Sequence, residues 1–361
     1  MIRVFGSRIS YYAGKLEAYL RYRGIEFELL SMLDHAREIR AGAGAVQSPV
    51  VKLEDGRWMS DSTPILAWFE AQRGGTSIYP EDPGMRFLAL LLEDHADEWL
   101  WRPAMHYRWS YRQDRDHASG ILSDELLSRL RRPRFAKRWG VARRQYGGFV
   151  RRDGVHAATR GHVEGSAMTA FAHLEAILAE RPFLLGDRPT IVDFGFVGPM
   201  FHHFSQDPTP AELMRHHAPR VYTWVARMWE ARPQPDTAEI LSDVDAPLEA
   251  LLREACETHL VQLRENARAY ANGKSHFAQE VQGCRYEGLP VSRYRVWCLE
   301  ELRRHWLELD ETTQTLLRTH LPEPGAAVLW SREPVARSDY DPERRAPFNR
   351  AIHVFGNGVP R

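Results

Sequence analysis

The chain has 361 residues, with 48 basic and 48 acidic side chains, so its formal net charge is zero. That balance excludes a protein built mainly to coat nucleic acid or an anionic membrane, although a local patch of one sign remains possible. The hydrophobic share of 43% supports a sizeable buried core. The length predicts two or three domains of roughly 100–200 residues each.

Three cysteines, Cys256, Cys284 and Cys298, all lie in the last third of the chain. Because their number is odd and their spacing is not that of a zinc site, we expect neither a disulfide framework nor a metal site. Their pattern favours a reducing, cytoplasmic location. The apolar runs are far shorter than the roughly 20 residues that span a bilayer, so we expect no membrane association.

The first thirty residues predict a β-strand, an α-helix and a second strand. Residues 2–5 form a short β-rich run. Apolar residues then recur at helical spacing between Ser10, at the N-cap position, and Gly24, where the helix should stop. Residues 25–30 alternate apolar and charged side chains, as a strand does. The order is that of a βαβ unit.

A hairpin and a helix follow after a polar, Gly-rich connection. Asp55-Gly56 lies between two short apolar runs and is a strong hairpin signal. Residues 60–64 then supply capping Asp and Ser side chains and a proline for a helix over residues 65–71. The order predicts a thioredoxin-like domain at residues 1–77, and the whole chain is predicted to be α+β.

Three features of this domain resemble the N-terminal domain of cytosolic glutathione transferases. Ser10 lies fourteen residues before Gly24, which is the spacing of the family's nucleophile position, and serine-type members carry Ser there. Pro49 resembles the family's cis-proline. Asp61-Ser62 resembles the acidic-Ser pair that grips the γ-glutamyl end of glutathione.

The resemblance implies glutathione as cosubstrate and a role for each matched residue. Ser10 would donate a hydrogen bond to the glutathione sulfur at a helix N-terminus, where the bond and the helix dipole both favour thiolate. Pro49, in the cis form, would expose the backbone of Ser48 to pair with an extended ligand. Asp61 would hold the ligand ammonium group, and Ser62 its α-carboxylate.

Alternatives remain open for the thiol-activating residue. Ser10 taken alone is equally well explained as a helix N-cap. Tyr11 or Tyr12 could supply the hydroxyl instead. Ser48 departs from the valine that the family usually carries before its cis-proline. Residues 15–21 are also similar to the metaxin and failed-axon-connection branch, whose catalytic status is often unclear. Since no cysteine lies near this helix, disulfide chemistry is disfavoured.

Basic residues are candidates for binding anions at two places. The glycyl carboxylate of glutathione requires a cation, for which Lys52 and Arg40 are candidates. Residues 131–162 contain ten Arg or Lys residues and one acid, Asp153. A solvated helix and loop is the simplest explanation of this basic segment. A docking surface for an anionic substrate or partner is the alternative, and nucleic acid is disfavoured because no recognised binding motif accompanies the charge.

The middle of the chain, residues 85–240, predicts an all-α domain of the transferase type. One helix should run from residue 85 to residue 101, with Pro103 interrupting the pattern. Thr190 and Asp193 form a capping box at the start of a buried helix, a motif that the transferase family also carries. In that family the helix pair that corresponds to residues 85–111 faces the electrophile. This makes four aromatic residues candidates for a substrate pocket: Trp101, Tyr107, Trp109 and Tyr111. The alternative for each is an ordinary core position.

About 120 residues remain after a transferase core, and residues 246–361 match no motif known to us. Apolar stripes predict helices over residues 247–270, 294–309 and 311–321, followed by an irregular, proline-rich tail. The helices are expected to pack on the core or on each other, with the tail draped over the surface, and closure of the active site is an alternative role for the segment.

Two functions are consistent with the sequence. The first is a glutathione-dependent enzyme whose thiolate attacks a hydrophobic or aromatic electrophile, by conjugation, isomerisation, ether cleavage or dehalogenation. The second is a non-catalytic binding or scaffold protein on the same fold. Members of the resembled family are commonly dimers, so a homodimer is possible.

Overall fold

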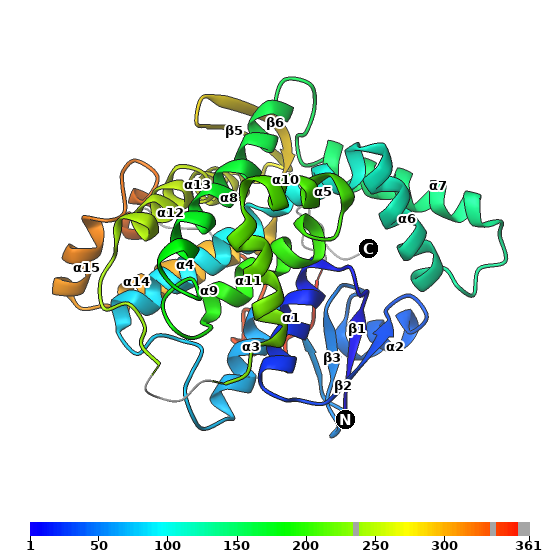
Figure 1. The fold of residues 1–361 in the computed structure, drawn as a ribbon, viewed down its shortest axis with the longest axis horizontal. Coiled ribbons are helices and arrows are strands. Elements are labelled where there is room, and N and C mark those ends of the chain that lie inside the picture. The colour runs from blue at the N-terminus through cyan, green and yellow to red at the C-terminus, as the bar shows by residue number, and fades with distance from the viewer. Residues whose placement is uncertain (234–237, 333–336, 353–361) are drawn as a thin grey trace.

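The computed structural model describes residues 1–233, 238–332 and 337–352 (Figure 1). The N-terminal part is a four-stranded sheet in the order β2-β1-β3-β4, in which β1 and β2 are parallel and the other two pairs are antiparallel. Its elements are β1 (Ile2–Gly6), α1 (Tyr11–Tyr22), β2 (Phe27–Ser31), α2 (Ala36–Ala43), β3 (Val50–Lys52), β4 (Trp58–Ser60) and α3 (Ser62–Ala71). This order confirms the predicted thioredoxin-like arrangement.

The ends of α1 are those that its sequence predicts. Ser10 is the N-cap, and its side chain accepts a hydrogen bond from the backbone of Ala13. Just after the helix, Gly24 has a φ of 63°, a left-handed conformation that glycine adopts at no steric cost. The prediction for α3 was partly wrong, because the helix begins at Ser62 rather than at residue 65. Asp61 holds its N-cap position with a φ of 75°, but its side chain makes no capping hydrogen bond.

The helical middle of the chain begins where α4 packs beside α1 and α9. Its elements are α4 (Pro83–Glu98), α5 (Trp101–Ser110), α6 (Arg112–Leu126), α7 (Arg134–Gln145), the π-helical turn η1 (Tyr146–Arg151), α8 (Arg160–Glu180), α9 (Ile191–Pro199), the π-helical turn η2 (Met200–Phe204), α10 (Pro208–His217) and α11 (Pro219–Glu230). The expectation that Pro103 interrupts the first of these helices is wrong. That helix already ends at Glu98, and Pro103 lies in the first turn of α5, where its missing N–H leaves no helical bond unmade.

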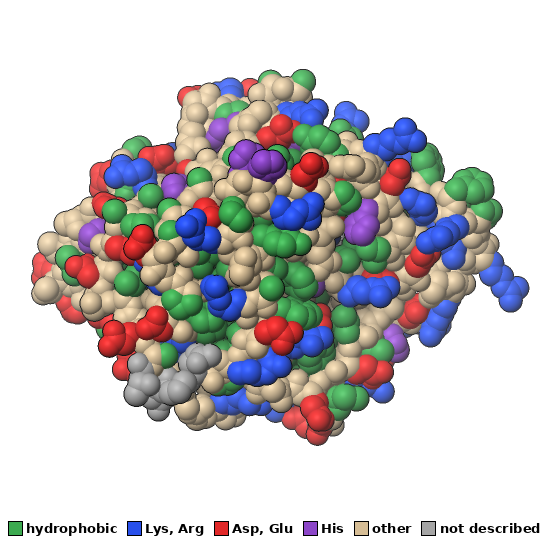
Figure 2. Space-filling view, in the orientation of Figure 1, with side chains coloured by type: hydrophobic (Ala, Val, Ile, Leu, Met, Phe, Trp, Pro, Cys, Tyr) green, Lys and Arg blue, Asp and Glu red, His purple; other side chains and the backbone are tan. Residues whose placement is uncertain are grey.

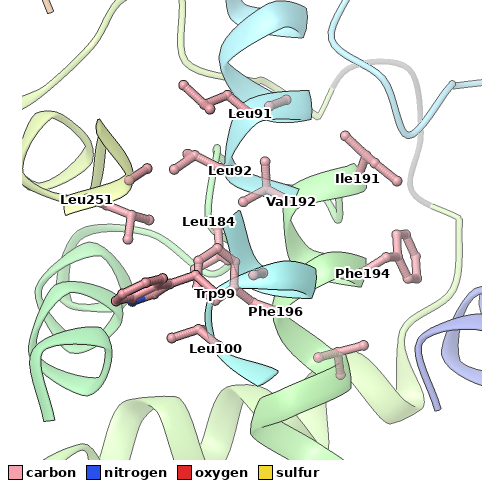
Figure 3. Packing of buried hydrophobic residues seen from close by; sticks show 14 of the residues in the cluster. Leu91, Leu92, Trp99, Leu100, Leu184, Ile191, Val192, Phe194, Phe196 and Leu251 are labelled. Atoms are coloured by element: carbon pink, nitrogen blue, oxygen red, sulfur yellow. The ribbon is translucent and has the colours of Figure 1, made fainter. Parts of the chain in front are cut away.

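Helix α9 is buried along its whole length and forms the centre of the core (Figure 3). Leu91 and Leu92 of α4 approach it from one side, and Leu251 of the C-terminal segment lies in the same cluster. The predicted capping box is present: Asp193 accepts hydrogen bonds from the backbone and hydroxyl of Thr190, at 2.9 and 3.0 Å. The box fixes where α9 begins and thereby which residues enter the core.

The C-terminal segment is not purely helical, which corrects the prediction. It contains α12 (Ala246–Glu257), α13 (His259–Ala271), β5 (His276–Val281), β6 (Cys284–Pro290), α14 (Arg293–Leu307), α15 (Glu311–Arg318) and α16 (Ala327–Trp330). The single helix expected over residues 247–270 is broken at Thr258 into two. The hairpin of β5 and β6, which turns at Gln282-Gly283, was missed, although β5 alternates exposed and buried residues along its whole length.

The helices of this segment pack on the transferase-type core, as the apolar stripes predict. Leu248, Leu251 and Leu299 belong to the same buried cluster as the residues of α4 and α9. Trp306 of α14 meets Phe87 of α4 edge to face, with ring centroids 5.2 Å apart. Among the described residues, no helix combines the length and apolar character needed to cross a membrane. The same residues contain no group of three or more His, Cys, Asp or Glu side chains that could hold a metal ion.

Candidate functional site

Ser10 and Ser48 come together at the N-terminus of α1. Their hydroxyl oxygens are 3.1 Å apart, and both side chains are half-buried. Gly6 of β1 permits this approach, because a Cβ there would lie 3.0 Å from the Ser48 hydroxyl and 2.9 Å from Ala13. The N-terminal end of α1 and the Ser10 hydroxyl therefore lie at one small region, where the helix dipole favours a negative charge.

The backbone of Ser48 is prepared for an extended ligand. The Ser48–Pro49 peptide bond is cis, as the resemblance predicted. Within the described part of the chain, neither the N–H nor the C=O of Ser48 takes part in a backbone hydrogen bond. Strand β3 begins at Val50, so these groups lie immediately before the sheet. A bound peptide could pair with them in the manner of an added strand.

Asp61 is buried, and residues of the C-terminal segment hold both of its oxygens. Oδ1 accepts a hydrogen bond from the hydroxyl of Tyr294 at 3.1 Å, and Oδ2 accepts one from Tyr340 at 3.2 Å. Burial raises the pKa of Asp61 to about 7, although Lys15 and the two tyrosines favour the charged form. Ser62, the first residue of α3, is buried beside it. The predicted acidic-Ser pair is thus present but covered.

The cover is formed by residues 338–351, which we call the C-terminal strap. Beyond Tyr340 it runs to β4, where the carbonyl of Pro347 accepts a hydrogen bond from the N–H of Ser60 at 3.0 Å. It ends at α2, where the N–H of Ala351 donates to the carbonyl of Ala43 at 2.8 Å. The sequence predicts a draped tail and allows it a role in closing the site, but an irregular tail carries no local signal of the residues that it contacts.

The tyrosines proposed as alternative activating groups point elsewhere. The Tyr11 hydroxyl donates to the carbonyl of Ala96, and the Tyr12 hydroxyl donates to that of Asp97 at 3.0 Å, both on α4. Burial, assisted by Asp97 and Glu98, raises the pKa of both hydroxyls well above the ordinary value. They therefore remain protonated and engaged with α4, which leaves Ser10 as the hydroxyl at the start of α1.

The four aromatic candidates do not form one pocket. Trp101 stacks on Tyr12, with centroids 5.5 Å apart and an angle of 19°, so it lies near the Ser10 end of α1. Tyr107 instead stacks on Tyr111, whose hydroxyl is bonded to Glu164. The remaining candidate, Trp109, is 1% exposed and belongs to a separate core cluster. Only Trp101 is positioned beside the Ser10 region.

The two basic groups have different surroundings. Lys52 forms an ion pair with Glu38 at 2.8 Å and lies over the ring of Trp58, while Arg40 is exposed. Much of the basic segment forms α7, none of whose residues is buried. Figure 2 shows basic side chains gathered over this α6–α7 edge of the molecule. Helix α7 is therefore exposed at the periphery, which is compatible both with a solvated helix and with a docking surface.

A buried ion cluster, not predicted from the sequence, lies behind α1. The ammonium of Lys15 contacts the carboxylates of Glu93 and Asp97 on α4 and donates to the hydroxyl of Thr63 at 2.9 Å. Burial lowers the pKa of Lys15, but the two carboxylates outweigh it and raise the pKa above its ordinary value. The cluster joins α1, α3 and α4. It therefore links the two helices, α1 and α3, whose first turns belong to the site.

Comparisons with known proteins agree with this geometry. A family model described as "Glutathione S-transferase, N-terminal domain" matches residues 9–72, and one described as "Glutathione S-transferase, C-terminal domain" matches residues 151–227. A search of curated proteins gave no match.

Several solved structures are similar to the chain at low sequence identity. A glutathione S-transferase from Methylobacterium radiotolerans, in complex with glutathione sulfonate, is 20% identical; the match covers 68% of this chain and 99% of that one, with a TM-score of 0.39. A glutathione transferase family member from Pseudomonas fluorescens, with bound glutathione, is 17% identical over 65% and 100%, with a TM-score of 0.36. The beta-etherase LigF from Sphingobium sp. is 18% identical over 63% and 94%, with a TM-score of 0.45.

The fold is a thioredoxin-like domain with a cis-proline, followed by an all-α domain. Two separate regions of the chain therefore match the N-terminal and C-terminal domains of glutathione S-transferases. Residues 246–361, including the segment that covers Asp61, lie outside both matches.

Proposed function

We propose that the protein binds glutathione along Ser48 and the first turns of α1 and α3, and uses its thiolate as a nucleophile. The observation that carries this proposal is that the Ser10 hydroxyl lies 3.1 Å from the Ser48 hydroxyl. Within the described residues, the backbone of Ser48 makes no backbone hydrogen bond and can pair with a peptide. The matches to the two glutathione S-transferase domains support glutathione as the cosubstrate. Asp61 and Ser62 would hold the γ-glutamyl end, and Lys52 or Arg40 the glycyl carboxylate.

The proposed chemistry begins with loss of the thiol proton. An ordinary thiol has a pKa of about 8.5, so most glutathione is protonated at neutral pH. A hydrogen bond from Ser10 and the dipole of α1 both stabilise the thiolate and lower that pKa. The thiolate then attacks an electrophilic carbon. It either adds to that carbon or displaces a leaving group from it. Conjugation, isomerisation, ether cleavage and dehalogenation all begin with this step.

The position of Trp101 favours an aromatic or hydrophobic electrophile. Its ring is partly exposed, stacks on Tyr12 and meets Phe149 edge to face at 5.7 Å. Tyr12 follows Ser10 by two residues, so this aromatic wall adjoins the place where the sulfur would lie. A flat apolar substrate could pack on such a surface while the thiolate approaches from the α1 side.

A non-catalytic binding protein is the second candidate, and one observation favours it. Both oxygens of Asp61 already accept hydrogen bonds from Tyr294 and Tyr340, so the group expected to hold the ligand ammonium is occupied. On this alternative the fold is retained for interaction with another partner. Glutathione would then fail to bind at any physiological concentration.

Calorimetric titration with glutathione separates the two candidates, and a variant tests the mechanism. The enzyme proposal expects binding at millimolar glutathione or below, with a thiolate absorbance band in the ultraviolet at neutral pH. Ser10→Ala should bind glutathione but lose most of that band. Ser166→Ala, which removes a hydroxyl bonded to a helix carbonyl of α8, is the control and should keep it. Absence of binding both by the unmodified protein and by a variant without the Tyr294 and Tyr340 hydroxyls that cover Asp61 would rule out the enzyme proposal.

A further inference from the structure

The covered half of the candidate glutathione site is built by this chain itself. Tyr294 lies on α14 and Tyr340 in the C-terminal strap, and their hydroxyls bond to opposite oxygens of Asp61. The two rings also pack on each other, with centroids 5.1 Å apart. Asp61 and Ser62 are 9% and 3% exposed as a result. A ligand ammonium therefore has no access to the carboxylate while the strap is in place.

The strap lies against the two ends of the proposed site but not against its middle. From Tyr340 at the start of α3 it passes the end of β4, where Pro347 pairs with Ser60, and reaches the end of α2 at Ala351. These places are the γ-glutamyl end of the proposed site and the helix that carries Arg40. Phe348 secures the middle of this path by meeting the ring of Trp68 edge to face.

Within the described residues, the strap does not cover the cysteinyl part of the site. Ser10 and Ser48 are half-buried, and the strap's hydrogen bonds to the N-terminal domain lie at Asp61, Ser60 and Ala43. The site therefore has an accessible half, where the sulfur would lie, and a closed half, where the γ-glutamyl group would lie. Glutathione cannot make both sets of contacts unless the strap moves.

The strap has a firm attachment at one end, about which it can open. The N–H and hydroxyl of Ser338 both donate to the carboxylate of Glu300 on α14, at 2.6 Å each. The carbonyl of Ser338 also accepts from Tyr270 and Arg293. Beyond this anchor, the described contacts with the N-terminal domain are single hydrogen bonds, the Phe348–Trp68 pair and the Arg57 guanidinium over the Phe348 ring. Such contacts cost little to exchange for those of a ligand.

We propose that the C-terminal strap is a built-in competitor that closes the γ-glutamyl half of the glutathione site. Glutathione binds only to the state in which Tyr294 and Tyr340 have released Asp61. This proposal rests on the proposed function, since it describes how that site is regulated. The apparent affinity for glutathione equals the intrinsic affinity multiplied by the fraction of molecules with the strap open.

A double variant, Tyr294→Phe with Tyr340→Phe, tests the competition by calorimetric titration with glutathione. It removes both hydrogen bonds to Asp61 and retains the rings, so the closed state should weaken while the fold persists. Because hydrogen bonds to charged groups are among the stronger ones, we expect glutathione to bind about tenfold more tightly than to the unmodified protein. Tyr222→Phe, on the exposed surface of α11, is the matched control and should leave the affinity unchanged.

The outcomes separate the two proposals. Equal affinity of the double variant and the unmodified protein would overturn the competition while leaving glutathione binding intact. Failure of both proteins to bind glutathione would overturn the proposed function, and the role of the strap with it.

Hydrogen exchange on the unmodified protein gives a second test that needs no variant. The N–H of Ser60 donates to the carbonyl of Pro347 in the strap, and the N–H of Ala351 in the strap donates to the carbonyl of Ala43. The two N···O distances are 3.0 and 2.8 Å. Saturating glutathione should accelerate exchange at Ala351 severalfold, because its acceptor on α2 is lost when the strap opens. The amide of Val281, in the β5–β6 ladder, should not change. Glutathione binding without faster exchange at Ala351 would contradict the proposal.

Discussion

The hydroxyl of Ser10 lies 3.1 Å from that of Ser48, across 38 residues of sequence. Either atom can donate, so in the free protein the Ser10 proton has an acceptor that competes with an incoming sulfur. Ser48→Ala removes that acceptor and leaves the Ser10 hydroxyl directed at the ligand. We therefore expect the pKa of bound glutathione to fall by about half a unit, since a neutral hydrogen bond contributes about 1 kcal/mol.

Ultraviolet titration of the bound thiolate measures this effect, with Ser10→Ala as the opposing case. The two variants should move the thiol pKa in opposite directions if Ser10 is the activating residue. A rise in Ser48→Ala as large as that in Ser10→Ala would instead assign the activation to Ser48.

The parts of the fold and of the site that could be predicted from sequence are those with local signals. The capping hydroxyl of Ser10, the left-handed Gly24 and the capping box of Asp193 each depend on residues a few positions apart, and all three are present. Short-range chemistry of this kind determines where helices begin and end. It therefore places the ends of α1 and α9 without knowledge of the rest of the chain.

The covering of Asp61 could not be predicted, because its partners are remote. Tyr294 and Tyr340 lie 233 and 279 residues away, and neither stands in a pattern that indicates its contact. The β5–β6 hairpin was missed for another reason. Its turn, Gln282-Gly283, has positive φ at both residues but lacks the Asn or Asp that usually marks such a turn.

Lys15→Met should strongly destabilise the protein. The ammonium is fully buried between Glu93 and Asp97, so its removal leaves two carboxylates facing each other without a counter-ion. Breaking a buried pair in this way costs about 3–5 kcal/mol of unfolding free energy. Denaturant unfolding measures the loss. Arg144→Met, at an exposed position of the solvated helix α7, should change the unfolding free energy by less than about 0.5 kcal/mol. Similar losses in both variants would refute the role of the cluster.

Gly14 is required by the packing of α1 on η2. A Cβ at this position would lie 1.8 Å from the ring of His202, which is 2% exposed and has little room to move. Gly14→Ala should therefore lower the unfolding free energy by about 1–3 kcal/mol, despite the better helix propensity of alanine. Gly165→Ala in α8 is the matched control. Its Cβ would meet nothing within 4 Å, so that variant should be neutral or stabilised by up to about 1 kcal/mol. Equal effects at the two positions would contradict the steric argument.

The closure of the strap should depend on pH through Asp61. Its carboxyl is faced by Lys15 from α1, Glu93 from α4, Tyr294 from α14 and Tyr340 from the strap. Burial raises the pKa of Asp61 from an ordinary 3.8 to about 7 when the strap is closed. The closed state thus retains its proton at a pH where the open state has lost it. Closure is favoured at low pH and weakens as the pH rises from about 4 to about 7.

Exchange at the Ala351 amide, corrected for the intrinsic effect of pH, measures this equilibrium without ligand. Between about pH 5 and about pH 8 the corrected opening constant should rise by about tenfold or more. Asp61→Asn has nearly the same shape and cannot ionise, so its opening constant should stay level across the same range. A level profile in the unmodified protein would show that the Asp61 proton does not control the strap. A rise retained in Asp61→Asn would assign the pH dependence to another group.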